Sequence, residues 1–133
     1  MEHALSSGAA FEKLGEFVAA QGGDADALEA LPVSGDVREV AAPRSGYVAG
    51  FGALGVGRAA LALGAGREKK TDQVDPGVGV EVLVKTGDEV EEGRAVARVY
   101  GSRDTERAEA LILASLELSD EPARRPPVIL GSL

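Results

Sequence analysis

The spacing of apolar residues predicts an amphipathic helix near the start of the chain. Between residues 9 and 21, Phe11, Leu14, Phe17 and Val18 recur at intervals of three and four, and charged residues occupy the opposite side. A helix of this kind needs another surface to cover its apolar face. We therefore expect these four side chains to pack against a partner.

Small and helix-breaking residues mark the ends of this helix. Ser6 or Ser7 can cap its start, and Gly22-Gly23 ends it. A second short helical turn is predicted from Asp24 to Leu31, before Pro32.

The pattern then changes from helical to alternating. Residues 37–41 and 46–51 predict two strands around a turn that contains Pro and Gly. Residues 53–63 return to the helical pattern, rich in Ala and Leu, and Gly64 and Gly66 end that helix.

The second half of the chain predicts further strands and one more helix. Residues 80–84 read as a strand, and Val90 and residues 95–100 supply further strand segments. Residues 67–79 form a polar loop whose length is typical of a functional connection. Asp104 is expected to cap the last helix. Its core-facing residues are expected to be Ala108, Leu111, Ile112, Ser115 and Leu116.

Together these elements predict an α+β fold. We expect a small sheet, one helix inserted between its strands and a second helix packed against it. The N-terminal helix is a candidate for a different domain, and a last short apolar run spans residues 128–130. Because only 4% of the residues are aromatic and none is Trp, the core is expected to consist mainly of Val, Leu, Ile and Ala.

Charge and cysteine content exclude several classes of function. The formal net charge of -8 argues against binding to nucleic acid or to an anionic membrane, because both need a basic surface. The 133-residue chain has no cysteine, which excludes disulfides, a thiolate nucleophile and a zinc–thiolate site. No apolar run approaches the ~18 residues that suggest a membrane span. The lack of cysteine fits a reducing cytoplasm, which is the expected location.

Two glycine motifs superficially suggest nucleotide binding. Gly50, Gly52 and Gly55 spell GxGxxG between a strand and a helix, and Asp75 lies twenty residues further on. A dinucleotide site also needs a parallel strand that ends at the acidic residue, but the sequence around Asp75 is loop-like. Tight turning and close helix–sheet packing are therefore the preferred explanation. The glycines of residues 64–71 follow a helix and lack the GxxxxGK[ST] spacing, so a glycine helix end is favoured over a phosphate loop.

The sequence contains no recognisable catalytic constellation. His3 is the only histidine and lies at the very start of the chain. The serines have no neighbouring histidine and no nucleophile-elbow motif, and the carboxylates have no metal-ligand spacing. We predict no catalytic residue, no metal ligand and no cofactor-binding residue in this chain.

Two stretches of the sequence carry a resemblance to a known family. AAPRSGYV at residues 41–48 continues into LGVGRAALALGAGR at residues 54–67. DPGVGV at residues 75–80 is followed by KTGDEVEEG at residues 85–93. Together they resemble the C-terminal domain of pyrimidine-nucleoside phosphorylases and thymidine phosphorylases.

The resemblance extends upstream and implies a domain organisation. SGAAFEKL at residues 7–14 and AQGGD at residues 20–24 resemble the last helix of the family's preceding catalytic domain. Residues 1–32 would then be the trailing helical segment of that upstream domain, and the apolar face of the helix would pack on it or on a substitute surface. Residues 33–133 would be the C-terminal domain, for which the resemblance implies an α/β hammerhead related to the barrel-sandwich hybrids of biotinyl and lipoyl carriers.

The resemblance also implies an activity for the complete enzyme. Members of this family cleave a pyrimidine nucleoside with phosphate, which gives free base and (deoxy)ribose-1-phosphate. The groups that hold phosphate and nucleoside lie in the family's upstream domains, so this chain is expected to be inactive alone. Its expected partners are the N-terminal catalytic domains of the same enzyme, which would form a homodimer without any cofactor.

The expected contribution of this chain is a wall of the catalytic cleft and a closing loop. By position, the loop that follows the LGAGR helix end runs from Gly66 to Gly79, and residues 67–78 are expected to be mobile. The candidate loop residues are Gly66, Arg67, Lys69, Lys70, Asp75, Gly77 and Gly79.

The related carriers supply an alternative interpretation, a stand-alone binding or biotinyl/lipoyl-like carrier module. Carriers present a modifiable lysine at a tight hairpin, in a Met-Lys-Met or Asp-Lys-Ala context. Here the helix at residues 53–63 and the long loop take that position, and Lys69 and Lys70 fit neither context. The phosphorylase interpretation is therefore preferred.

Overall fold

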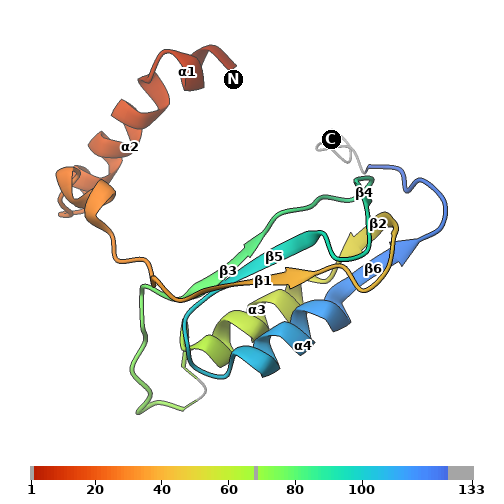
Figure 1. Cartoon of the computed structure of the whole chain (residues 1–133). Coiled ribbons are helices and arrows are strands. Elements are labelled where there is room, and N and C mark those ends of the chain that lie inside the picture. The colour runs from red at the N-terminus through yellow and green to blue at the C-terminus, as the bar shows by residue number, and fades with distance from the viewer. Residues whose placement is uncertain (1, 68, 126–133) are drawn as a thin grey trace, which may run out of the picture. The chain divides into compact units, whose positions relative to one another are not determined.

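The computed structural model describes residues 2–67 and 69–125, which divide into two units between Pro32 and Val33 (Figure 1). Each unit has its own internal contacts and is described by itself. The assignment of the first unit to the end of a catalytic domain stays a prediction.

The first unit is entirely helical. It contains α1 (Glu2–Ser6), α2 (Ala9–Ala20) and a 3₁₀ helix, η1 (Asp26–Ala30). The predicted serine cap of α2 is wrong, because Gly8 occupies the N-cap with a left-handed φ of 81°. A glycine adopts this conformation without strain, which allows the chain to turn sharply between α1 and α2.

The apolar face of α2 lies exposed within its unit, and the expected packing of its side chains on a covering surface is not seen. No described residue of α1 or α2 is buried. The side chains of Phe11 and Phe17 are 58% and 63% exposed, and that of Leu14 is 45% exposed. Exposed aromatic residues at helical spacing indicate a contact surface.

The second unit contains two three-stranded antiparallel sheets, rather than the single sheet expected. One has the strand order β1-β5-β3 and the other has the order β4-β2-β6. The strands are β1 (Val37–Ala41), β2 (Gly46–Phe51), β3 (Gly79–Val82), β4 (Glu89–Val90), β5 (Ala95–Tyr100) and β6 (Leu116–Ser119). Although β1 and β2 are consecutive, they pair with different partners, so the turn between them connects two sheets.

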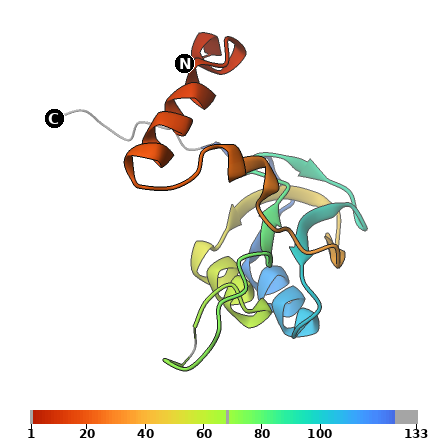
Figure 2. The same ribbon diagram turned by 90° about the vertical axis from the view of Figure 1, so that its left-hand side faces the viewer.

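Two helices cover one face of the β1-β5-β3 sheet. Helices α3 (Ala53–Leu63) and α4 (Thr105–Ser115) lie side by side along this sheet (Figures 1 and 2). Their buried residues include Ala59, Leu63 and Ile112. The second unit is therefore α+β, as the sequence predicts.

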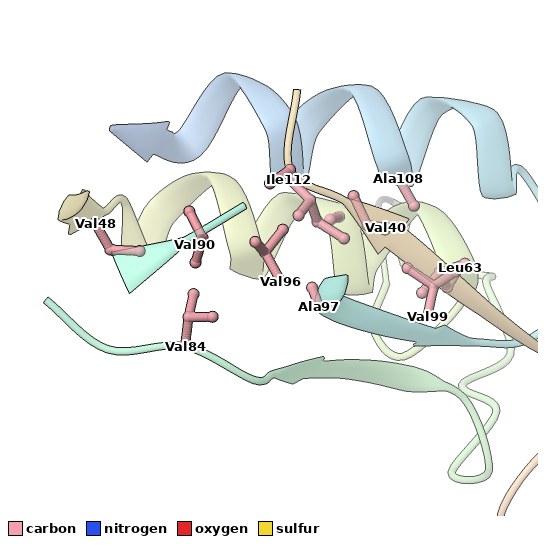
Figure 3. Packing of buried hydrophobic residues seen from close by; sticks show 12 residues of the cluster. Val40, Val48, Leu63, Val84, Val90, Val96, Ala97, Val99, Ala108 and Ile112 are labelled. Carbon is pink, nitrogen blue, oxygen red and sulfur yellow. The ribbon is translucent and has the colours of Figure 1, made fainter. Parts of the chain in front are cut away.

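The hydrophobic core lies between the strands and the two helices (Figure 3). Its buried residues are Val40, Ala42, Val48, Ala59, Leu63, Val84, Val90, Val96, Ala97, Val99, Ala108 and Ile112. Among the described residues no aromatic side chain is buried, and Phe51 packs against the cluster from its edge. The expectation of an aliphatic core is confirmed.

The glycine motif before α3 has a packing role. The Gly52 N–H donates to the Ser115 carbonyl oxygen at 2.8 Å, which ties the start of α3 to the end of α4. A Cβ atom on Gly55 would lie 1.8 Å from Ser115 Oγ and 3.1 Å from Ser115 Cβ. Only a glycine at residue 55 allows the two helices to approach this closely. Close packing of α3 against α4 therefore accounts for Gly52 and Gly55, whereas the sequence predicted packing of a helix against a sheet.

Two details at the ends of α4 differ from expectation. Asp104 does not cap the helix with its side chain, and it adopts a left-handed φ of 48°. Its Oδ2 atom instead accepts a hydrogen bond from Arg107 Nη1 at 3.4 Å. Leu116 belongs to strand β6 and not to the helix, because its backbone pairs with Phe51 of β2. The apolar run at residues 128–130 lies outside the described residues.

Candidate functional site

The candidate closing loop connects α3 to β3 and projects from the end of α3, away from the β4-β2-β6 sheet (Figures 1 and 2). It starts at Gly64, whose left-handed φ of 105° ends the helix. The side chains of Arg67, Lys69 and Lys70 are exposed to solvent. These three cations therefore lie at the outer part of the loop.

The outer part of the loop contains a locally closed turn. The Lys69 N–H donates to Asp72 Oδ2 at 2.8 Å, and the Asp72 N–H donates to the Lys69 carbonyl oxygen at 3.0 Å. An aspartate that bonds to a nearby backbone group in this way is typical of a turn. Both hydrogen bonds are made within the loop and do not tie it to the body of the unit.

The two ends of the loop are tied together and to the body. The Asp75 N–H donates to the Gly64 carbonyl oxygen at 3.0 Å, so the two ends meet. The Asp75 carboxylate accepts from the Gly77 N–H at 2.9 Å. The Gly77 carbonyl oxygen in turn accepts from the Ser34 N–H at 2.7 Å, which attaches the loop to the segment before β1.

A polar pocket of about 350 Å³ lies beside the tied ends of the loop. Its lining residues are Ser34, Asp36, Leu63, Gly64, Gln73, Asp75, Val78, Gly101, Ser102 and Arg103. A second pocket of about 410 Å³ shares Asp36, Gly101 and Ser102 with it and continues toward the start of α4 at Thr105. The two pockets form one open groove at the end of the β1-β5-β3 sheet.

The structure brings together only some of the residues that the sequence singles out. Asp75 lines the pocket, whereas Arg67, Lys69 and Lys70 line neither pocket. The pocket residues Asp36, Ser102 and Arg103 were not predicted from the sequence, because they sit in short connections that carry no motif. Their proximity follows from the antiparallel pairing of β1 with β5, which places Val37 opposite Tyr100.

The groove does not contain the features of a self-sufficient catalytic centre. Within residues 2–67 and 69–125, no group of three or more His, Asp or Glu side chains could hold a metal ion. The same residues include no buried side-chain nitrogen or oxygen without a hydrogen-bond partner. Asp36, Asp75 and Arg103 are all exposed. The groove is therefore a solvated surface feature and not an enclosed site.

The APRSG segment holds the β4-β2-β6 sheet together. Arg44 donates from Nη1 to Asp120 Oδ1 and from Nη2 to the Leu118 carbonyl oxygen, both at 2.7 Å. Ser45 Oγ accepts from the Glu92 N–H at 2.9 Å. This segment is therefore bonded to the end of β6 and to the residues just after β4, and it plays a structural part.

The KTGD segment is a tight turn with an ionised aspartate. The Lys85 N–H donates to Asp88 Oδ2 at 2.9 Å, and Arg125 donates to Asp88 Oδ1. The hydrogen bond from Lys85, followed by the contact with Arg125, lowers the pKa of Asp88 below its usual value. Gly87 adopts a left-handed φ of 91°, which the turn requires.

Lys69 and Lys70 do not occupy a carrier-type hairpin. They lie in the connection between a helix and a strand, and β3, the strand that follows, pairs with β5. This placement argues against the carrier alternative. No helix in the described part of the chain is both long and apolar enough to cross a membrane.

Comparisons with known proteins give the family. Residues 47–119 match the family described as "Pyrimidine nucleoside phosphorylase C-terminal domain". The pyrimidine-nucleoside phosphorylase of Geobacillus stearothermophilus is 33% identical over 137 aligned residues, which cover 100% of this chain and 32% of that protein. The pyrimidine-nucleoside phosphorylase of Staphylococcus aureus strain USA300 is 40% identical over 103 residues, which cover 75% of this chain and 24% of that protein. The chain thus spans about a third or less of the length of these curated relatives. On this evidence, the chain belongs to the family of pyrimidine nucleoside phosphorylase C-terminal domains.

Proposed function

We propose that this chain acts as the C-terminal domain of a pyrimidine-nucleoside phosphorylase. The enzyme would cleave pyrimidine nucleosides with phosphate to free base and (deoxy)ribose-1-phosphate. The observation that carries the proposal is the match of residues 47–119 to this domain family, together with a relative of that name that aligns over the whole chain.

In this proposal the chemistry takes place on other domains of the enzyme. The reaction passes through a transition state of oxocarbenium character, so catalysis rests on the positioning of phosphate and on stabilisation of charge on the leaving base. The described residues supply no enclosed polar site for either group, and the groove beside Asp75 is open to solvent. The chain would therefore be inactive alone and would supply one wall of the catalytic cleft.

The closing loop is the part of this domain that would reach the substrate. The loop from Gly66 to Gly79 projects beyond the end of α3, and its candidate residues are polar or glycine. When such a loop closes, it excludes water from the cleft and holds the reactants in position. Its cations Arg67, Lys69 and Lys70 have the charge that suits a cleft occupied by phosphate.

The finer assignments belong to the same proposal. We assign the second unit to the α/β hammerhead folds. Along the chain, α3 is inserted between β2 and the later strands β3 to β6, which complete the two sheets. Residues 1–32 would form the trailing helix of the catalytic domain, whose surface would cover the exposed face of α2. The complete enzyme would be a cytoplasmic homodimer.

A chimera tests the proposal. This chain would replace the aligned C-terminal third of the G. stearothermophilus enzyme, and phosphorolysis of thymidine and uridine would be measured. We expect turnover by the chimera, none by the chain alone, and a lower kcat/KM when residues 67–74 are replaced by a short glycine linker.

A matched control keeps the interpretation specific. Gly57→Ala changes an exposed position of α3 that has no neighbouring atom within 4 Å of the new methyl group, so this chimera should keep full activity. Full activity of the chimera without residues 67–74 would contradict the role of the loop. Turnover by the chain alone would contradict the placement of the chemistry on other domains.

A further inference from the structure

We propose that the KTGD turn is the docking site of the chain segment that follows β6. This segment, the C-terminal strap, comprises residues 120–125. Gly87 admits the backbone of the strap, and the Asp88 carboxylate binds its Arg125. The inference concerns contacts inside the second unit and does not depend on the proposed activity.

The strap leaves β6 in a fixed direction. Arg44 Nη1 donates to Asp120 Oδ1 at 2.7 Å at the start of the strap. The Glu121 N–H donates to Ser119 Oγ at 3.1 Å, which is a turn of the kind that serine hydroxyls form. After this turn the chain runs back toward β4 and the KTGD turn that precedes it (Figure 1). The strap is thereby brought to the motif.

The KTGD turn is held by hydrogen bonds that do not involve the strap. The Gly87 N–H donates to the Val48 carbonyl oxygen at 2.7 Å, and the Val48 N–H donates to the Asp88 carbonyl oxygen at 2.8 Å. Within the turn, the Lys85 N–H donates to Asp88 Oδ2 at 2.9 Å. Because the turn is bonded to β2 in this way, it presents a preformed surface to the strap.

The strap passes Gly87 at a distance that leaves no room for a side chain. A Cβ atom on Gly87 would lie 2.9 Å from the Ala123 carbonyl oxygen and 3.0 Å from Arg125 Cγ. The first of these is a backbone atom, so the strap itself would have to shift. The approach of the strap is therefore a second reason for glycine at residue 87, besides the left-handed φ of 91°.

Gly93, in the next tight turn, shows what the backbone conformation requires without the strap. Its φ of 84° is close to that of Gly87, but a Cβ atom on Gly93 would meet nothing within 4 Å. The two glycines thus share their conformation and differ in the contact with the strap. This difference makes the contact at Gly87 testable by matched substitutions.

A charge pair fastens the end of the strap. Arg125 Nη2 donates to Asp88 Oδ1, and the side chains are 63% and 27% exposed, respectively. An ion pair with this exposure is weak and is screened by salt. The close contact at Gly87 therefore sets the path of the strap, and the ion pair adds a small, salt-dependent preference for the docked position.

Limited trypsin digestion of the 133-residue chain measures this docking. Trypsin cleaves after Arg124 but not after Arg125, because Pro126 follows Arg125, so the mass of the released fragment identifies cleavage within the strap. A docked strap is protected, because the protease cuts the undocked form. Gly87→Ala should raise the cleavage rate after Arg124 about fivefold, since the new methyl group overpacks the contact. Asp88→Asn should raise this rate about twofold at low salt and have no effect in about 1 M salt.

Each substitution has a matched control that leaves the cleaved sequence unchanged. Gly93→Ala places alanine at nearly the same positive φ without touching the strap, and it should cleave after Arg124 like the wild type. Glu89→Gln removes the charge of the neighbouring exposed carboxylate and should also have no effect. Cleavage after Arg98, in the central strand β5, measures global unfolding in the same digest. Rates after Arg124 are compared between variants relative to the rate after Arg98.

Nuclear magnetic resonance gives a second measurement that needs no protease. The heteronuclear NOE of the Ala123 amide, which reports fast backbone motion, should fall in Gly87→Ala and stay at the wild-type value in Gly93→Ala. Equal cleavage rates and equal NOE values in the two glycine variants would overturn the inference. An effect of Asp88→Asn that is the same at all salt concentrations would overturn the part assigned to the ion pair. Because Asp88→Asn keeps both glycines, its salt dependence decides the matter if Gly87→Ala does not fold.

Discussion

Replacement of Gly55 by alanine should force apart the two helices that cover the sheet. The new Cβ atom would lie 1.8 Å from Ser115 Oγ, 3.1 Å from Ser115 Cβ and 3.4 Å from the Leu111 carbonyl oxygen. Ser115 Oγ cannot turn away freely, because it donates to the Leu111 carbonyl oxygen at 2.6 Å. The clash is therefore relieved only by loss of this hydrogen bond and by a shift of α4.

The change in the free energy of unfolding combines two losses with one gain. Overpacking of a close contact costs about 1–3 kcal/mol, and the lost hydrogen bond adds about 1 kcal/mol. Alanine is more favourable than glycine in a helix by about 1 kcal/mol, which offsets part of this loss. We expect Gly55→Ala to lower the free energy of unfolding by about 2 kcal/mol.

Gly57 provides the matched control on the same helix. A Cβ atom at Gly57 would meet nothing within 4 Å, so only the helix-propensity term applies. Gly57→Ala should raise the free energy of unfolding by about 0.5–1 kcal/mol.

Denaturant unfolding monitored by circular dichroism measures both variants. Ser115→Ala in the Gly55→Ala background removes the closest atom and should restore about 1 kcal/mol, which a double-mutant cycle would report as coupling. Equal effects of Gly55→Ala and Gly57→Ala, or no coupling between Gly55 and Ser115, would refute this account of the glycine motif.

Two further predictions concern the segments that tie the strands together. Arg44→Ala removes the hydrogen bond to the Leu118 carbonyl oxygen, and chemical denaturation should detect a loss of about 1 kcal/mol that Arg44→Lys, with one donor group in place of the fork, does not restore. The exposed ion pair between Arg44 and Asp120 should contribute little to the free energy of unfolding, so Asp120→Ala should leave stability nearly unchanged. The lowered pKa of Asp88 means that its charge stabilises the folded state above about pH 4, the value for an unfolded aspartate, and that this contribution disappears as the pH falls through the lower folded value. Thermal unfolding from pH 7 down to pH 2 should therefore show a stability difference between wild type and Asp88→Asn that shrinks at the acidic end; a constant difference would contradict this assignment.

The local elements were predictable because their signals are local. The alternation at residues 37–41 and 46–51 and the helical pattern at residues 53–63 give β1, β2 and α3 with the bounds that the structure has. The pairing of these strands was not predictable, because β1 pairs with β5 and β2 pairs with β4 and β6 across long stretches of chain. A single sheet was expected for this reason, and two were found.

Strand β6 was missed because its first residue continues the helical spacing of α4. Leu116 lies four residues after Ile112, and only its pairing with β2 places it in a strand. The short helix α1 was also missed, because its five residues contain too few apolar positions to give a period.

The candidate site was predictable only in part. Glycines after a helix and the polar composition of residues 66–79 locate the loop. The groove beside it could not be predicted, since Ser34, Asp36, Ser102 and Arg103 meet through the pairing of β1 with β5. The hydrogen bonds of Asp75 likewise depend on the position of Gly64 at the end of α3.

The most direct measurement of the central claim compares phosphate-dependent release of thymine by three samples at equal concentration. These are the chain alone, the G. stearothermophilus enzyme without its aligned C-terminal third, and the chimera that joins them. The account predicts rapid release by the chimera and none above background by either part. Release by the chain alone, at a rate that depends on phosphate, would contradict it.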